Sequence, residues 1–310
     1  MPKRIQSPSS INIYKECPRK YYYRYVMGLP MRPTLQQTRG KIVHAVLYRF
    51  FDELPKQLNH PDISISCDGA TDANTEICND FWENADELIT KTIQNLLAEE
   101  WFKARSELDK FALNRAEEAA YFEESLAMLL NWAGWFRKRL EALRGLSFAE
   151  AFFKLTPIAR EWEYISVEHS VRGIIDAVEL SADGDVTIID YKTTGEGEVN
   201  DYKIQLATYA QLYTEFHGKM PEKVGVHFLK DGVFKAIPVD PSLLAFAKSE
   251  FEQIHIKTAS DNIEDYPQVI GSHCKWSGGK CDFYELCFPN GRQAPRARAQ
   301  GLDVGSAQKL

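Results

Sequence analysis

Apolar residues in the first half of the chain recur every three or four positions, which is the spacing of an amphipathic helix. In residues 38–54 the apolar positions that share one face are Ile42, Ala45, Val46 and Phe50. Residues 81–144 keep a helical pattern throughout, with few strand or turn signals. Residues 7–29 predict a short helix and then a second one that opens at Pro18, because proline is favoured in a first helical turn. Residues 55–80 lack a sustained period and predict a loop.

The pattern changes after residue 147, where short apolar runs separated by turn signals predict strands. The expected strands are 148–156, 161–180, 186–193, 223–229 and 233–239. Hairpin turns are expected at SADGD (181–185) and KDG (230–232), because both are rich in turn residues. Helical patterns over 200–219 and 242–260 alternate with these strands. We therefore expect a mixed sheet flanked by helices, in an α/β or α+β arrangement.

These patterns divide the chain into four expected segments. Residues 1–54 form an N-terminal segment, and residues 55–147 form a loop followed by a helical insert. Residues 148–290 contain the expected sheet, together with most of the clustered cysteines. Residues 291–310 are poor in large apolar groups, which predicts a disordered tail.

The composition is that of an ordinary soluble globular protein, with 44% hydrophobic and 26% charged residues in a chain of 310. No run reaches the roughly 18 apolar residues that cross a bilayer, so no membrane partner is expected. No apolar stretch follows Lys3 and Arg4, so we expect no secretory signal and a cytoplasmic protein. The formal charge of −7 argues against a protein that coats nucleic acid, but it allows a local basic groove.

An acid and a base stand two positions apart at the end of the run TIIDYKTT (187–194). Side chains on a strand alternate between faces, so Asp190 and Lys192 would project side by side. The turn at 181–185 makes the preceding strand an antiparallel neighbour, and that strand contains Asp176. Two carboxylates can bind one divalent cation, and a neighbouring lysine can orient a water molecule. The alternative is a solvated ion pair at a strand end.

Two predicted helices add candidate polar groups. His44 follows Gly40 by four residues and is a candidate imidazole ligand, although a lone histidine on a helix is otherwise a satisfied core or surface residue. Gln205 and Tyr209 are four residues apart and share a helix face that should look toward the strand ends. Their alternative role is simple packing. Gly173 precedes the first carboxylate by three residues and permits a close approach of another element to that strand.

The order and spacing of these motifs resemble the RecB-like branch of the PD-(D/E)xK nuclease superfamily. The motifs are Gly40 with His44, Asp176 in GIID, Asp190-Tyr191-Lys192, and Gln205 with Tyr209. The opening SPSSINIYKECPRKYYYRYV also looks like the N-terminal segment of that branch. The resemblance covers residues 7–54 and 165–290 and leaves the insert near 81–144 uncovered. It implies a restriction-endonuclease-like α/β fold in which the first and third segments form the nuclease core.

The resemblance also implies a role for each motif residue. The implied ligands of Mg²⁺ or Mn²⁺ are His44, Asp176, Asp190 and the carbonyl of Tyr191. Lys192 would position the attacking water, and Gln205 and Tyr209 would brace the site or touch the nucleic-acid backbone. The implied activity is a Mg²⁺- or Mn²⁺-dependent deoxyribonuclease that hydrolyses phosphodiester bonds.

The cysteines are unevenly distributed. Three lie within residues 274–287 in a polar, glycine-rich stretch, and one lies near the start of the chain. These four cysteines are Cys17, Cys274, Cys281 and Cys287. Disulfides are not expected in a cytosolic chain, but four such thiols can form a tetrahedral zinc site or bind an iron–sulfur cluster. The alternative is a set of unrelated buried cysteines. We assign no role to Cys67 and Cys78.

The four clustered cysteines are similar to the 4Fe-4S site of the cluster-bearing RecB-like nucleases, which include the CRISPR-adaptation exonucleases. That family usually has two residues between the second and third cysteines, whereas this chain has six between Cys274 and Cys281. The departure leaves zinc as an alternative, with His273 as a substitute ligand. Either group would join the two ends of the chain and couple to folding.

The resemblance favours a single-strand exonuclease that acts on single-stranded or frayed DNA ends in DNA repair, recombination or CRISPR adaptation. The alternatives are a structure-specific endonuclease, a non-catalytic nucleic-acid-binding subunit and a redox-sensing iron–sulfur protein. Residues 19–24 mix aromatic rings with cations, which suggests base stacking along a basic track, although at least one of Tyr21, Tyr22 and Tyr23 must face inward. The sequence leaves open a helicase or integrase partner, the polarity of cleavage and the choice between DNA and RNA.

Overall fold

The structure is a computed structural model. The described residues are 3–58, 72–277 and 279–289, with only the backbone described for residues 58 and 72–81. The chain divides into two compact units, each assembled from segments that are far apart in sequence. The larger unit comprises Met1–Pro8 and Pro33–Lys257, and the smaller one comprises Ser9–Arg32 and Thr258–Leu310. The expected tail, 291–310, lies outside the described residues.

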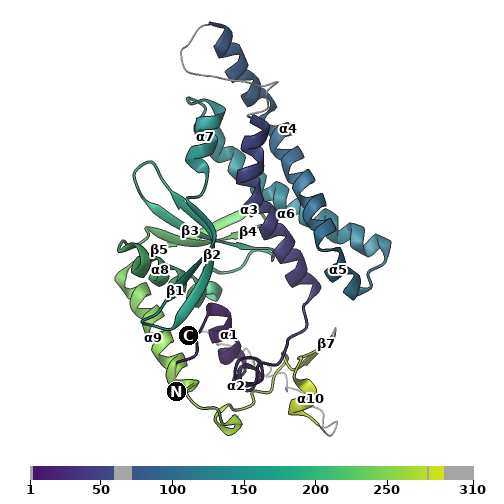
Figure 1. Cartoon of the computed structure of the whole chain (residues 1–310), viewed down its shortest axis with the longest axis vertical. Coiled ribbons are helices and arrows are strands. Elements are labelled where there is room, and N and C mark those ends of the chain that lie inside the picture. The colour runs from purple at the N-terminus through teal and green to yellow at the C-terminus, as the bar shows by residue number, and fades with distance from the viewer. Residues whose placement is uncertain (1–2, 59–71, 278, 290–310) are drawn as a thin grey trace, which may run out of the picture. The chain divides into compact units, whose positions relative to one another are not determined.

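The larger unit is built on a five-stranded sheet with the order β1-β2-β3-β4-β5 (Figure 1). The strands are Ala159–Ser166 (β1), Val171–Leu180 (β2), Val186–Lys192 (β3), Lys223–Phe228 (β4) and Val233–Pro238 (β5). β3 and β4 run parallel, whereas every other neighbouring pair is antiparallel. A parallel pair needs a long crossover, and here it contains helix α8 (Lys203–His217) after a short 3-10 turn, Val199–Tyr202. The predicted mixed α/β sheet is confirmed.

Helices from the first half of the chain share one hydrophobic core with the sheet. They are α3 (Leu35–Leu58), α4 (Asp72–Lys103), α6 (Arg115–Glu141) and α7 (Phe148–Leu155), with a short α5 (Arg105–Leu108) and a 3-10 turn, Asp109–Phe111. At the centre, Phe50 of α3 meets Trp132 and Phe136 of α6 edge to face, at 5.1 and 5.7 Å between ring centroids. Ile189 and Tyr191 of β3 belong to the same core. The predicted helices at 38–54 and 81–144 are therefore confirmed.

Helix α8 packs on β1 to β4, and α9 (Pro241–Lys257) packs on α8. The approach of α8 to β2 is close at Gly173, where an added Cβ would lie 3.0 Å from the ring of Tyr209. Any larger residue would push this ring away, so the glycine fixes how deeply Tyr209 can enter. The close approach expected at Gly173 is thus present, and the approaching group is a motif residue.

The expected strand at 148–156 is wrong, because Phe148–Leu155 forms helix α7. Ser147 and Glu150 form a capping box, in which each side chain bonds the other residue's backbone N–H. The buried positions Phe148, Ala151 and Phe152 follow the spacing of a helix rather than that of a strand. The Ser-x-x-Glu signature before the apolar run is the sequence signal that would have identified this helix.

Two other boundaries differ from expectation. The predicted loop at 55–80 is helical at both ends, since α3 continues to Leu58 and α4 begins at Asp72; the intervening 59–71 lie outside the described residues. The run 161–180 is divided by a tight turn over residues 167–170, which makes β1 and β2 a hairpin.

Among the described helices, none combines the length and the apolarity that a membrane span requires.

The smaller unit joins the two ends of the chain. Its elements are α1 (Pro8–Glu16), α2 (Pro18–Tyr21), a π-helical turn (Tyr22–Val26), a 3-10 turn (Ile263–Asp265), β6 (Lys275–Trp276), β7 (Gly279–Lys280) and α10 (Tyr284–Cys287). The ring of Tyr266 stacks on Tyr21 at 6.1 Å, and its carbonyl accepts a hydrogen bond from Arg19 Nε at 2.7 Å. Tyr21 and Tyr23 are buried, so these two rings form core contacts instead of a base-stacking surface.

The capping box of α7 gives a direct test of why this segment is helical. We expect Ser147→Ala to lower the free energy of unfolding by about 1 kcal/mol, because the N-terminal N–H groups of α7 lose their acceptor. The matched control is Glu150→Gln, whose amide oxygen can still complete the box. Urea unfolding followed by circular dichroism measures both. Equal stability of Ser147→Ala and the unsubstituted chain would contradict the role of the cap.

Candidate active site

Strand β3 ends with the acid and the base that the sequence placed two positions apart. Lys192 Nζ lies 2.7 Å from Asp190 Oδ2, and the Asp190 side chain is only 2% exposed. This burial excludes the solvated ion pair that was the alternative. Burial raises the pKa of Asp190 to about 6, although Lys192 opposes the shift. Burial also disfavours the ammonium form of Lys192, but Asp190 outweighs it and raises the pKa of Lys192 above its usual value.

Helix α8 holds this ion pair from one side. Gln205 Oε1 accepts a hydrogen bond from Lys192 Nζ at 3.0 Å, and Gln205 Nε2 donates to Asp190 Oδ1 at 2.7 Å. The same amide group lies 2.7 Å from the hydroxyl oxygen of Tyr209. The helix face shared by Gln205 and Tyr209 therefore looks toward the end of β3, as their spacing predicts. Asp190 is thus held at Oδ1 by the Gln205 amide, while its Oδ2 faces the Lys192 ammonium group as an ion pair.

Asp176 reaches the same place from β2. The ladder between β2 and β3 ends at Ala177 and Ile189, so Asp176 occupies the next position beside Asp190. Its carboxylate Oδ2 accepts a hydrogen bond from the backbone N–H of Tyr191 at 2.7 Å. Asp176 is 9% exposed. The hairpin thus brings the two predicted carboxylates to one end of the sheet.

His44 enters from α3, far away in sequence. Its Nε2 lies 3.0 Å from the carbonyl oxygen of Tyr191, and its Nδ1 lies 3.5 Å from Asp176 Oδ1. Burial disfavours the imidazolium form, but Asp176 and Glu161 outweigh this effect and raise the pKa of His44 well above 6.5. A cation bound here would compete with that proton, because imidazole binds metals only in its neutral form.

Glu161 of β1 is a site residue that the sequence reasoning missed. Its Oε1 lies 3.2 Å from His44 Nδ1. In the described part of the chain, one group of potential metal ligands converges, with all ligand atoms within 4.8 Å of one another: His44, Glu161 and Asp176. An imidazole and two carboxylates form a donor set that suits Mg²⁺ or Mn²⁺.

The backbone explains how Glu161 reaches the site. The ladder pairs Arg160 with Ala177 and Trp162 with Ile175, which leaves Glu161 unpaired opposite Asp176. Glu161 has a φ of 46°, a left-handed value that is uncommon for a non-glycine residue within a strand. Such strain is concentrated at functional sites. Predicting the tight turn at 167–170 would have made β1 and β2 a hairpin, and the register of that hairpin places Glu161 opposite Asp176.

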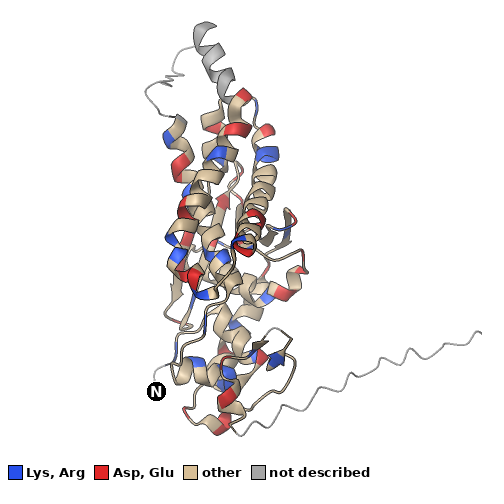
Figure 2. Cartoon of the chain, turned by 90° about the vertical axis from the view of Figure 1, so that its right-hand side faces the viewer, with Lys and Arg blue, Asp and Glu red and all other residues tan. Residues whose placement is uncertain are grey.

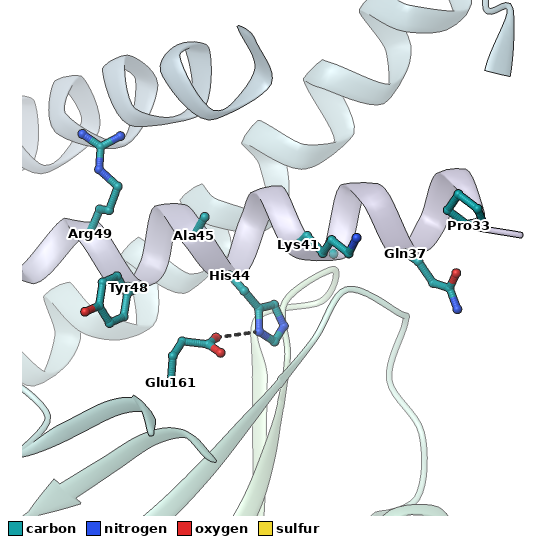
Figure 3. Close-up of a pocket in the computed structure, with 9 residues that line it drawn as sticks. Pro33, Gln37, Lys41, His44, Ala45, Tyr48, Arg49 and Glu161 are labelled. Carbon is teal, nitrogen blue, oxygen red and sulfur yellow. Dashed lines mark hydrogen bonds and ion pairs between the residues drawn. The ribbon is translucent and has the colours of Figure 1, made fainter. Parts of the chain in front are cut away.

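The structure therefore brings together His44, Asp176 and the Tyr191 carbonyl, as the motif comparison expected. Asp190 lies beside them but is engaged by Lys192 and Gln205, and Glu161 completes the converging group in its place. His44 and Glu161 line a groove of about 860 Å³ that follows α3 (Figure 3). A buried acid–lysine pair beside a group of potential metal ligands is an arrangement that can activate water for hydrolysis once a metal is bound.

A family model for the PD-(D/E)XK nuclease superfamily matches residues 6–288. The chain belongs to this superfamily. Among solved structures, the nuclease is similar to a crystal structure of a candidate exonuclease from Eubacterium rectale, with 12% sequence identity and a TM-score of 0.39. That match covers 89% of this chain and 100% of the other. No curated protein matches the sequence.

The smaller unit of the nuclease gathers the four predicted cysteines. They line one small pocket together with Lys20 and His273; the four are Cys17, Cys274, Cys281 and Cys287. Burial and the neighbouring thiols Cys17, Cys281 and Cys274 raise the pKa of Cys287 to about 11. All four are free cysteines. Cys67 lies outside the described residues, and the side chain of Cys78 is not described.

The six-residue spacing between Cys274 and Cys281 has a structural explanation. Lys275–Trp276 pairs with Gly279–Lys280 as a two-stranded hairpin. The hairpin returns the chain, so the backbone N–H of Cys281 donates to the carbonyl of Cys274 at 3.0 Å. The inserted residues thus leave the two cysteines adjacent. His273 Nε2 lies 2.9 Å from the carbonyl oxygen of Val269.

The converging group gives a prediction for metal affinity. We expect Glu161→Gln to weaken Mn²⁺ binding by roughly 10- to 100-fold, because the amide removes one negative oxygen donor. The matched control is Glu163→Gln, since Glu163 lies on the same strand and pairs with Arg172 at 3.2 Å. Isothermal titration with Mn²⁺ measures both variants. An unchanged affinity for Glu161→Gln would remove Glu161 from the ligand set.

Proposed function

We propose that this nuclease is a Mg²⁺- or Mn²⁺-dependent deoxyribonuclease that removes nucleotides from single-stranded or frayed DNA ends. The observation that carries the proposal is the meeting of two groups at the end of β3. One is the converging set of His44, Glu161 and Asp176, and the other is the buried Asp190–Lys192 pair. The exonuclease and single-strand assignments rest on the motif resemblance to RecB-like nucleases.

Each residue of the site has its own role in the proposed hydrolysis. His44, Glu161 and Asp176 would hold a divalent cation, which would supply Lewis-acid chemistry by polarising the phosphate and lowering the pKa of water. Lys192 orients the attacking water with its ammonium group, which Asp190 and Gln205 hold at 2.7 and 3.0 Å. Asp176 accepts the Tyr191 N–H, which keeps its second oxygen turned toward His44. Every group is therefore positioned before substrate arrives.

The catalytic roles proposed for Lys192 and Asp190 predict that replacing either residue lowers the rate of cleavage. We expect Lys192→Ala to lower the rate of cleavage by roughly 10²- to 10⁴-fold, because the attacking water loses its orienting group. Asp190→Ala should have a similar effect, since Lys192 then loses its partner. The assay uses labelled single-stranded DNA with Mn²⁺, and circular dichroism confirms that each variant folds.

The matched control is Lys223→Ala, which removes an exposed lysine at the opposite end of the neighbouring strand β4. Undiminished cutting by Lys192→Ala would rule the mechanism out. Linear and circular single strands of one sequence separate the modes of cleavage. An exonuclease leaves the circle intact, whereas cutting of the circle identifies an endonuclease. The absence of cleavage of any DNA or RNA substrate would favour a non-catalytic nucleic-acid-binding subunit.

The proposal includes a 4Fe-4S cluster on the four clustered cysteines. The four thiols line one pocket, where they could hold either a 4Fe-4S cluster or one zinc ion. The choice of the cluster over zinc rests on the motif resemblance to the cluster-bearing RecB-like nucleases. The cluster would join segments from both ends of the chain and stabilise the smaller unit.

The cluster assignment is tested by metal analysis of anaerobically purified protein. We expect about four iron atoms per chain and the visible absorbance of an iron–sulfur cluster. Cys281→Ala should lose both signals, whereas Cys67→Ala, which changes a cysteine outside the set, should keep them. One zinc ion per chain and a colourless sample would instead assign the pocket to zinc.

A further inference from the structure

The groove beside the converging group follows one face of α3. Its lining residues Gln37, Lys41, His44 and Tyr48 recur every three or four positions, so they form one stripe along the helix. Figure 3 shows Gln37, His44 and Tyr48 on the side of α3 that meets Glu161, while Arg49 points from the opposite side. His44 therefore has an exposed lysine one turn before it and an exposed ring one turn after it.

The cations of α3 differ in their availability. Lys and Arg are interspersed with Asp and Glu along the helices (Figure 2), so the local partners of each cation decide whether it can bind a ligand. Arg39 is held by Glu124 at 2.5 Å. Arg49 lies 2.6 Å from Glu100 and is also held by other carboxylates. Both guanidinium groups are largely neutralised by these contacts.

Lys41 is different. Its side chain is 69% exposed, and its ion pair with Glu107 is long, at 3.7 Å. An ion pair with this geometry and exposure is worth little and is readily exchanged for another anion. Lys41 is therefore the groove cation that is best able to bind a phosphate.

Tyr48 offers an aromatic surface on the other side of His44. The residue is 42% exposed. Arg160 donates to the Tyr48 carbonyl at 2.6 Å, and its guanidinium lies 5.2 Å from the ring centroid. Arg160 is itself fixed by Asp52 at 2.7 Å. The position of the ring is thus supported, although much of the residue remains open to solvent.

From this arrangement we infer that α3 is the track of a single nucleic-acid strand. A backbone phosphate contacts Lys41, the scissile phosphate lies at His44, and a base stacks on Tyr48. Aromatic rings along a basic track are how single strands are held without sequence readout. A base inside a duplex is stacked on both faces and cannot stack on Tyr48 as well, so the ring favours unpaired strands. The inference rests on the proposed nuclease function and adds the path of the substrate.

The dimensions agree with this path. Lys41 and Tyr48 are seven residues apart, which is about 10 Å along a helix. Roughly three nucleotides span that distance at the 3.4 Å rise of a stacked strand. One bound strand can therefore reach both residues while a phosphate between them sits at His44.

The test measures binding without cleavage. A Lys192→Ala background and fluorescein-labelled single-stranded DNA are used with Mg²⁺, and anisotropy gives the dissociation constant at several salt concentrations. On this background, Lys41→Gln should reduce the slope of log affinity against log salt by about 0.7, the value for one lost phosphate contact. The control Lys56→Gln lies on the same helix outside the groove and has a similar exposure, 66% against 69%. Its slope should equal that of the background.

The ring is tested separately with Tyr48→Leu and Tyr48→Phe. Losing one stacked base should weaken single-strand binding by roughly 5- to 100-fold for leucine, whereas phenylalanine keeps the ring and the affinity. Affinity for a blunt duplex should not change in either variant. Melting temperatures confirm that both variants fold.

The outcomes distinguish the track from the nuclease function. If the unsubstituted chain cleaves DNA while Lys41→Gln keeps the full salt slope and Tyr48→Leu binds normally, the track is wrong and the nuclease assignment stands. Equal binding of duplex and single strand would also overturn the track. If the unsubstituted chain neither binds nor cleaves nucleic acid, the proposed function and the track both fail.

Discussion

The main chain of Tyr191 ties together three elements that are remote in sequence. Its N–H donates to Asp176 of β2 at 2.7 Å, and its carbonyl oxygen lies 3.0 Å from Nε2 of His44 on α3. Its ring is buried in the core shared with the helices. Asp190 and Lys192 are the residues immediately before and after Tyr191 in β3. One buried backbone position thus sets the distances among the imidazole, the carboxylates and the ammonium group.

Much of this arrangement could be predicted because it depends on local periodicity. Strand alternation placed Asp190 beside Lys192, and the short turn after β2 made Asp176 their neighbour. The four-residue spacing on a helix turned Gln205 and Tyr209 toward the same end of the sheet. Strands β3 to β5, helix α8 and the long helices followed from the same two periods. His44 was a candidate ligand from its residue type alone, but its place beside the two carboxylates came from the motif resemblance, since nothing local relates a helix to a strand so far away.

The parts that were missed depend on geometry that a pattern does not record. Glu161 reaches the site through a left-handed backbone, of which its neighbours in the sequence give no sign, and through a hairpin register that depends on the turn at 167–170. The helix at 148–155 was read as a strand because a short phenylalanine-rich run satisfies both periods, and only the cap decides. The residues between Cys274 and Cys281 looked like an interruption, whereas hairpin pairing makes the two cysteines adjacent.

The central claim is that His44, Glu161 and Asp176 surround one divalent cation next to Lys192. Anomalous diffraction at the manganese edge, from crystals grown with Mn²⁺, tests this claim most directly. We expect one strong peak within roughly 2.5 Å of an imidazole nitrogen of His44 and a carboxylate oxygen of Asp176. A fully occupied manganese peak elsewhere in the molecule, with none between these side chains, would contradict the account.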